Sequence, residues 1–414
     1  GPTSASWVGS RRGDISEPHV PLIAPAYFSA SSGMSARVLQ QGERAHILRL
    51  SLLATPDAEG VDMTQEPLPR KPEISRWRKL ILIRTDRIGD MLVTTPCIRA
   101  IRQALPDIRL DMLASAHNSP AICGNPYLDG IHVFDRRHPL SWGKLVSRLR
   151  AERYDAALVF NSNSRSASFL SMLIGVPERV GFSGAPLRGG RIRWGYGSTY
   201  TNLPRGGGSV QVTLDMLEKL DAIGIPAASP HMDFVVPGEL TQAMRRSFPL
   251  MPGRLRLALF VGNIKKVTKR WPVEKFRTLA LRLLETEEDL DIVILTGPSD
   301  QPLLKGFAGV SNPRLSYFTG RTLQESGAFL QTCCAMVAGS SGPTHVAAAL
   351  DVPVLSVTTR YSATVWGTLG KYDDCVTPDT DTPDMRGIAM EPVEAMVRKF
   401  LAGERARRME RGTD

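Results

Sequence analysis

Short, mostly apolar runs of four to six residues recur along this 414-residue chain from position 80 onward. Such runs are typical of strands buried in a parallel sheet, because both faces of such a sheet are covered. Helical patterns lie between several of the runs, and strands that alternate with helices predict crossover connections. The expected strands are residues 80–83, 110–114, 131–134, 156–160, 257–261, 291–295, 335–338 and 352–357.

The pattern occurs twice, so we expect an α/β fold with two Rossmann-like halves facing one another across a cleft. Pro226, Pro230 and Pro237 mark a linker between the halves. The expected organisation is a partly flexible extension (1–76), a first domain (77–238), a second domain (239–385) and a basic helix (386–414). The main expected helices are residues 91–105, 210–223, 272–285 and 391–411, with an amphipathic helix over 36–53 and a long loop over 183–208.

The chain is strongly basic, with a formal net charge of +10 and a pI of about 9.5. This balance predicts an acidic partner, either nucleic acid, anionic lipid or a phosphorylated substrate. Nucleic acid is the least favoured of these, because the basic residues are dispersed, aromatic residues make up only 7% and no nucleic-acid-reading motif is present.

The cysteines and the hydropathy pattern indicate a cytoplasmic protein. None of the five cysteines has a spacing typical of a zinc site, and three lie in apolar segments, as buried thiols do. No run of 18 apolar residues is present, so no membrane-spanning helix is predicted. The cysteines are Cys97, Cys123, Cys333, Cys334 and Cys375.

The first candidate site is the turn after the strand at 80–83, which reads Arg84-Thr85-Asp86-Arg87-Ile88-Gly89-Asp90. Gly89 permits a tight turn, and Asp90 falls at the start of the next helix. Arg84 and Arg87 are expected to keep the neighbouring carboxylates ionised. The structural alternative is that Asp90 only caps the helix, which aspartate does well.

Three further turns, all in the second half, suit phosphate recognition. Residues 339–343 are small and precede a helix expected to start near Thr344, and backbone N–H groups at a helix start form an anion site. Residues 265–272 carry clustered cations after a strand. Asp300 follows a third strand and could accept ribose hydroxyls. The alternatives are a capped helix with a core-facing His345, a solvated basic loop and an ordinary surface turn.

The distribution of these turns predicts different roles for the two halves. The second half would hold a nucleotide-sugar donor, and the first would activate an acceptor. With these motifs the chain resembles the heptosyltransferases, family 9 of the glycosyltransferases, which have the GT-B fold. The resemblance spans about residues 79–370 and rests on segments 84–96, 124–129, 133–135, 269–272, 318–320, 341–349 and 366–367.

The resemblance implies an inverting, metal-independent enzyme without a cofactor. It would move a heptose from ADP-heptose to a lipopolysaccharide core acceptor, a phosphorylated glycolipid, at the inner face of the cytoplasmic membrane. Asp90 would be the general base. The implied donor-binding residues are Thr268, Lys269, Asp300, Ser340, Ser341, Gly342, Thr344 and His345. The candidate acceptor-binding residues are Arg87, Arg136, Arg137, Arg165 and Arg188, and the basic tail at 405–411 could rest on an anionic membrane surface.

One departure from the family pattern affects specificity. Many relatives carry an aspartate near the donor sugar where this chain has Ser340, so the identity of the donor sugar stays open. The long extension is also unusual for the family. The remaining alternatives are another nucleotide sugar, a protein or other glycan acceptor, and a binding-only relative. The protein-modifying relatives carry a cysteine metal finger, which is not visible here.

Overall fold

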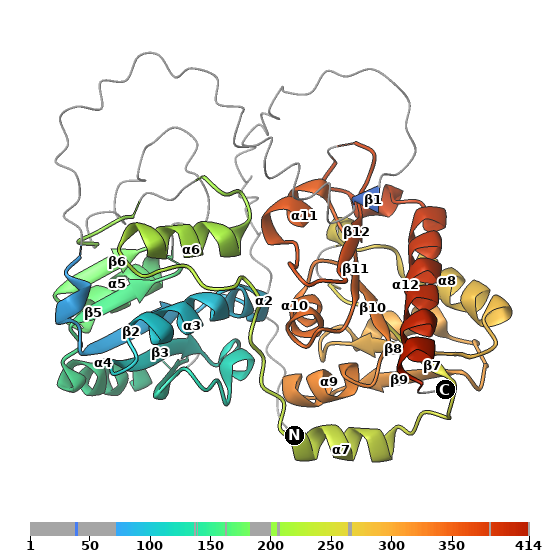
Figure 1. Cartoon of the computed structure of the whole chain (residues 1–414), viewed down its shortest axis with the longest axis horizontal. Coiled ribbons are helices and arrows are strands. Elements are labelled where there is room, and N and C mark those ends of the chain that lie inside the picture. The colour runs from blue at the N-terminus through green and yellow to red at the C-terminus, as the bar shows by residue number, and fades with distance from the viewer. Residues whose placement is uncertain are drawn as a thin grey trace, which may run out of the picture. The chain divides into compact units, whose positions relative to one another are not determined.

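The computed structural model describes residues 38–39, 72–135, 138, 140–161, 164–182, 200–204, 208–263, 267–380 and 382–412. All these residues belong to one compact unit, which contains two mainly parallel sheets (Figure 1). The α/β architecture predicted from the apolar runs is therefore confirmed.

The first sheet has five parallel strands in the order β4-β3-β2-β5-β6. Alternate residues of β2 point to opposite faces, where Leu80 and Leu82 pack with α3 and α6 and Ile81 and Ile83 pack with α4 and α5. The strands are β2 (Lys79–Arg84), β3 (Arg109–Ser115), β4 (Gly130–Phe134), β5 (Ala156–Val159) and β6 (Glu178–Gly181). The helices are α2 (Ile88–Leu92), α3 (Thr95–Ala104), α4 (Leu140–Glu152), α5 (Arg165–Leu173) and α6 (Val212–Ala222).

The second sheet has seven strands in the order β1-β12-β11-β10-β7-β8-β9, and only the β1–β12 pair is antiparallel. Helices α8 and α12 cover one face, and α9 and α10 cover the other. The strands are β1 (Val38–Leu39), β7 (Leu255–Phe260), β8 (Leu290–Thr296), β9 (Leu315–Thr319), β10 (Ala335–Ala338), β11 (Val354–Val357) and β12 (Asp374–Val376). The helices are α7 (Gly238–Ser247), α8 (Val273–Thr286), α9 (Leu323–Leu330), α10 (Gly342–Ala349), α11 (Arg360–Trp366) and α12 (Met390–Arg411).

The helix predicted over 91–105 is in fact two helices. Helix α2 ends at Leu92 and α3 begins at Thr95. Pro96 has no N–H to donate to the Leu92 carbonyl, which accepts the Thr95 hydroxyl instead, at 2.7 Å. The break turns the short α2 into a separate element that carries Asp90 in its first turn.

The helix predicted over 36–53 is wrong at its start, because Val38 and Leu39 form β1 and pair with Cys375 and Val376 of β12. The rest of that helix, and nearly all of the loop predicted over 183–208, lie outside the described residues. The helix expected near Thr344 begins two residues earlier, at Gly342, as α10. No helix in the described part of the chain is both long and apolar enough to cross a bilayer.

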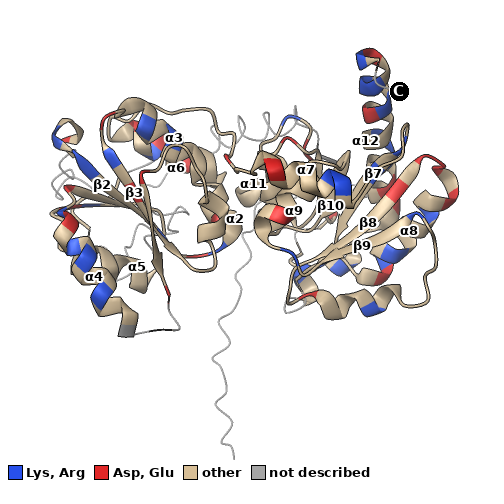
Figure 2. Cartoon of the chain, turned by 90° about the horizontal axis from the view of Figure 1, so that it is seen from below, with Lys and Arg blue, Asp and Glu red and all other residues tan. Residues whose placement is uncertain are grey.

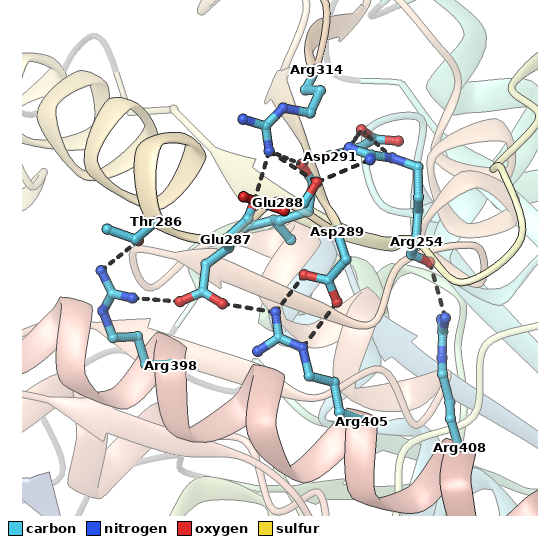
Figure 3. Close-up of polar contacts among 11 residues, drawn as sticks. Arg254, Thr286, Glu287, Glu288, Asp289, Asp291, Arg314, Arg398, Arg405 and Arg408 are labelled. Atoms are coloured by element: carbon cyan, nitrogen blue, oxygen red, sulfur yellow. Dashed lines mark hydrogen bonds and ion pairs between the residues drawn. The ribbon is translucent and has the colours of Figure 1, made fainter. Parts of the chain in front are cut away.

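Charged residues of both signs are interspersed over the helices of both halves (Figure 2). The basic tail of α12 is part of this mixture. Arg405 donates to both Asp289 oxygens, at 2.9 and 2.5 Å, and to Glu287 at 2.7 Å (Figure 3). Arg407 and Arg408 pair with Glu404 of the same helix. Of the arginines expected to face anionic lipid, Arg405 therefore pairs with carboxylates of the α8–β8 connection, whereas Arg407 and Arg408 pair within α12 itself.

The hydrogen bonds from Arg405 also lower the pKa of the Asp289 carboxyl. We expect Arg405→Ala to lower the free energy of unfolding by roughly 1–2 kcal/mol, because it removes the partner of the half-buried Asp289 carboxylate and leaves Glu287 paired with Arg398 alone. Chemical denaturation measures the loss, which should shrink in molar salt as the charges are screened. Arg411→Ala is the control, since Arg411 is 61% exposed and lies 3.9 Å from Glu404. Equal losses in the two variants would contradict the assignment.

Candidate active site

In each sheet, the expected ligand-binding position is at the ends of the central strands. In the first sheet β2 lies between β3 and β5, and in the second β7 lies between β8 and β10. The strand order reverses at these strands, and in such sheets the loops beyond the carboxyl ends diverge to opposite sides and leave a crevice. The turns chosen from the sequence follow β2, β7, β8 and β10, so all four lie at the ligand-binding edge of their sheets.

Arg84 organises the turn after β2. It is only 3% exposed, and its guanidinium donates to Asp86 at 3.0 Å and to the Thr94 hydroxyl at 2.8 Å. A third, longer contact joins it to Asp90, with 3.5 Å between Nη2 and Oδ1. The Thr94 hydroxyl in turn donates to the Asp90 carbonyl, at 2.9 Å. Both carboxylates are thus held by one buried cation that extends from the end of the strand.

Burial raises the pKa of the Asp90 carboxyl, and the nearby Asp86 carboxylate raises it further. Arg84 and Arg87 act in the opposite direction, but their effect is smaller. The two arginines therefore favour the ionised carboxylate, as expected, but burial and Asp86 outweigh them, so the net pKa lies above that of an ordinary aspartate. A carboxylate with a raised pKa is a stronger base, which is the property that proton abstraction requires.

The capping alternative for Asp90 is partly correct. Arg87 is the N-cap residue of α2, and its backbone N–H donates to the Asp90 carboxylate. This places Asp90 at the third helical position, where acidic side chains bond back to the N-cap N–H. The bond also orients the carboxylate, so the structural role and a catalytic role are compatible.

Two asparagines next to this turn were not selected from the sequence. Asn118 donates to the Arg84 carbonyl at 3.1 Å. Asn161, just after β5, donates to the Thr85 hydroxyl at 3.2 Å, and its Oδ1 is buried without a hydrogen-bond partner among the described residues. The only sequence signal for Asn161 is that it is the first polar residue after an apolar run.

Two loops of the second sheet meet at a small pocket. One follows β7 and the other follows β10, and the pocket lies where their two strands pair. Asn263 adopts a left-handed conformation with φ of 66°, which is uncommon for a residue other than glycine. The pocket is lined by Phe260, Gly262, Asn263, Lys269, Arg270, Trp271, Phe276, Gly339 and Ser341.

The predicted donor residues of the β10 loop are held by short hydrogen bonds. The Ser341 and Thr344 hydroxyls lie 2.9 Å apart, and Thr344 donates to the Gly339 carbonyl at 2.7 Å. Ser341 is the N-cap residue of α10 and makes no side-chain capping bond. Ser340 and Gly342 are half-buried, while Thr268 and Lys269 of the β7 loop are exposed.

Asp300 is not in an exposed surface turn, since only 9% of it is accessible. It approaches the pocket-lining loop closely, because a methyl group built on Gly262 would lie 3.2 Å from its Oδ2. The same methyl would lie 2.3 Å from the Phe260 ring, so Gly262 permits the approach of these side chains. Asp300 is therefore adjacent to the predicted donor site.

His345 faces the core, as the structural alternative for this residue predicted. It is 5% exposed, and burial lowers its pKa to about 4, so the ring is neutral. A methyl built on Gly89 of α2 would lie 2.7 Å from Cδ2 of this ring. The imidazole therefore packs against the turn that carries Asp90.

The predicted acceptor-binding arginines are mostly beyond the described part of the chain. Arg87 is exposed beside Asp90. Arg136, Arg137 and Arg188 lie outside the described residues, and for Arg165 the structure describes the α5 backbone but not the side chain. Their role stays a prediction.

The two sheets and their connections define a GT-B fold. A glycosyltransferase of family 9 from Veillonella parvula superposes with a TM-score of 0.67 at 17% identity, over 79% of this chain and 97% of that one. The Escherichia coli ADP-heptose lipopolysaccharide heptosyltransferase II superposes with a TM-score of 0.64 at 20% identity, over 79% of this chain and 99% of that one. These similarities confirm the predicted fold.

The sequence comparisons identify the family. The model of glycosyltransferase family 9 (heptosyltransferase) matches residues 142–389, more than half of the chain, which therefore belongs to this family. Lipopolysaccharide heptosyltransferase 3 of Escherichia coli K12 is 25% identical over 281 residues, which cover 65% of this chain and 79% of that protein. The matched range begins after Asp90, so the role of Asp90 depends on its geometry and on the resemblance of its turn.

Proposed function

We propose that this chain catalyses heptose transfer from ADP-heptose to a lipopolysaccharide core acceptor, with inversion at the anomeric carbon. The observation that carries the proposal is Asp90, a half-buried carboxylate with a raised pKa at the ligand-binding edge of the first sheet. The substrates are inferred from the relatives, since one is named as an ADP-heptose heptosyltransferase and another as a lipopolysaccharide heptosyltransferase.

The reaction is a single displacement. Asp90 accepts the proton of the acceptor hydroxyl while that oxygen forms its bond to the anomeric carbon. The bond from this carbon to the diphosphate oxygen breaks, and ADP leaves with the electron pair. General-base assistance of this kind contributes roughly 10²–10⁴-fold to the rate.

The second half would stabilise the departing diphosphate. Lys269 offers an exposed ammonium group, and Ser341 and Gly342 offer backbone N–H groups at the start of α10. Because the leaving group is already anionic and stable, the reaction needs no general acid. We further propose that it needs no metal ion or other cofactor.

One observation favours a donor other than ADP-heptose. Ser340 is half-buried beside the pocket-lining Gly339 and Ser341, where an aspartate would bring a negative charge near the donor sugar. A serine hydroxyl both donates and accepts hydrogen bonds, so it selects less strongly for the pattern of sugar hydroxyls that a carboxylate recognises. Another nucleotide sugar, or another glycan or protein acceptor, is therefore the alternative.

In this proposal, the acceptor binds to the first half. Exposed Arg87 lies beside Asp90, and its charge suits the phosphates of a glycolipid core. We propose that catalysis takes place at the inner face of the cytoplasmic membrane, where such an acceptor would be presented.

A panel of nucleotide sugars tests the donor. We expect ADP-heptose to raise the thermal midpoint more than UDP- or GDP-linked sugars, because at equal concentration a ligand that binds the folded state more tightly stabilises it more. Transfer should then be measured with the same donors and a lipopolysaccharide core acceptor, with and without a chelator. Preference for a UDP or GDP donor would overturn the heptose assignment, and loss of transfer in chelator would overturn metal independence.

A further inference from the structure

Arg270 is a cation of the second half that has no counterion among the residues that the structure describes. It follows Lys269 and precedes the buried Trp271 at the end of the β7–α8 connection. The residue is half-buried, and its Nη1 is buried without any hydrogen-bond partner in the described part of the chain. No ion pair joins it to a described carboxylate. It was not among the donor-binding residues chosen from the sequence.

Of the other described arginines of this half, Arg277 also has a buried nitrogen without a partner, but three others donate to groups of the protein itself. Arg254 donates to Asp291 at 3.0 and 2.5 Å, and Arg256 donates to the Thr332 hydroxyl at 2.8 Å. Arg314 donates to the Glu287 carbonyl at 2.7 Å. A guanidinium stays charged at every physiological pH, so a buried donor without a partner reduces the stability of the protein. Retention of such a group suggests that its partner is a ligand.

The position of Arg270 indicates which ligand that is. Arg270 is one of the residues that line the small pocket between the β7 and β10 loops, together with Gly339 and Ser341. This pocket lies at the carboxyl ends of the two central strands, where nucleotides bind in sheets of this kind. The planar fork of arginine matches two oxygens of one phosphate group, which an ammonium group such as that of Lys269 does not.

We propose that Arg270 binds the diphosphate of the nucleotide-sugar donor and neutralises the charge that develops on it as the glycosyl bond breaks. The inference rests on the proposed function. It adds Arg270 beside Lys269 as a second cation, whose planar guanidinium binds phosphate oxygens in a defined geometry. No proton moves to or from Arg270 in this step. The diphosphate oxygen keeps the electron pair of the broken bond, and the guanidinium offsets its charge.

Titration with ADP tests the proposal. We expect Arg270→Met to raise the Kd for ADP by about 10- to 100-fold, as the loss of a charged hydrogen bond predicts, and to change the Kd for adenosine far less. Arg277→Met is the matched control, because Arg277 in α8 also has a buried nitrogen without a partner but does not line the pocket. An ADP affinity within twofold of wild type in Arg270→Met would overturn the proposal.

Thermal unfolding without ligand separates binding from a structural role. Because Arg270 has no partner to lose among the described residues, Arg270→Met should keep or raise the thermal midpoint while it weakens the binding of ADP. A midpoint several degrees lower would show that the side chain supports the fold, and would overturn the proposal. If the wild-type protein binds none of ADP, UDP or GDP, the proposed function fails together with this inference. If it binds one of them as tightly as Arg270→Met does, only this inference fails.

Discussion

Replacing Asp90 with asparagine is expected to lower kcat by roughly 10²–10⁴-fold, because the amide cannot accept the proton of the acceptor hydroxyl. Donor affinity should stay within a few-fold of wild type, since Asp90 lies in the first half and the donor loops lie in the second. The amide oxygen can still accept the Arg87 N–H that the carboxylate accepts in the wild type. Single-turnover transfer and ADP titration measure the two quantities separately.

The same substitution is expected to stabilise the protein at neutral pH. The folded pKa of Asp90 is raised above its ordinary value of 3.8. The folded state therefore binds this proton more tightly than the unfolded state, and stability falls as pH rises through the folded pKa. Asp90→Asn removes that loss, so its thermal midpoint should exceed that of the wild type at about pH 7 and approach it at about pH 4.

Asp86→Asn is the matched control, because Asp86 also accepts a hydrogen bond from Arg84 but its side chain is 30% exposed, against 16% for Asp90. Loss of the Asp86 charge should lower the pKa of Asp90 and move the acid limb of the pH–rate profile to lower pH. If Asp86→Asn lowers kcat as much as Asp90→Asn does, the effect is not specific to Asp90, and the assignment of Asp90 as the base fails. Activity of Asp90→Asn within a few-fold of wild type would exclude Asp90 as the base.

Buried strands were the most predictable part of the fold. All eight expected strands exist, and all of them except β4, where Ile131 and Val133 are exposed, are apolar runs covered on both faces, which leave a clear pattern. Strand β12 was not predicted, since its three residues include Asp374, and strand β9 was not, since Tyr317 within it is 41% exposed. The break between α2 and α3 depends on one proline and one hydroxyl, which a periodic pattern does not reveal.

The position of the site was predictable, whereas its electrostatics were not. A polar turn after a central strand lies at the ligand-binding edge whatever its composition. The direction of the Asp90 pKa, however, depends on how much of the carboxylate is buried, and that depends on tertiary packing. Arg270 was overlooked for the same reason, because a cluster of cations does not indicate which of them lacks a partner.

Arg84→Met is expected to lower the free energy of unfolding by about 3 kcal/mol, because it removes the buried partner of two carboxylates and leaves them uncompensated. The loss should be largest at neutral pH and decrease in acid, where Asp86 and Asp90 become protonated. Denaturant titrations at about pH 7 and about pH 5 measure the difference.

The same substitution should alter catalysis in a way that a purely structural change would not. Arg84 lowers the pKa of Asp90, so its removal raises that pKa further and shifts the acid limb of kcat/KM to higher pH. Arg87→Met is the matched control, since Arg87 also lowers this pKa but is exposed, and its loss should move the limb less and leave stability within about 0.5 kcal/mol of wild type. If Arg84→Met loses stability while its pH profile stays in place, the group that titrates in the profile is not Asp90.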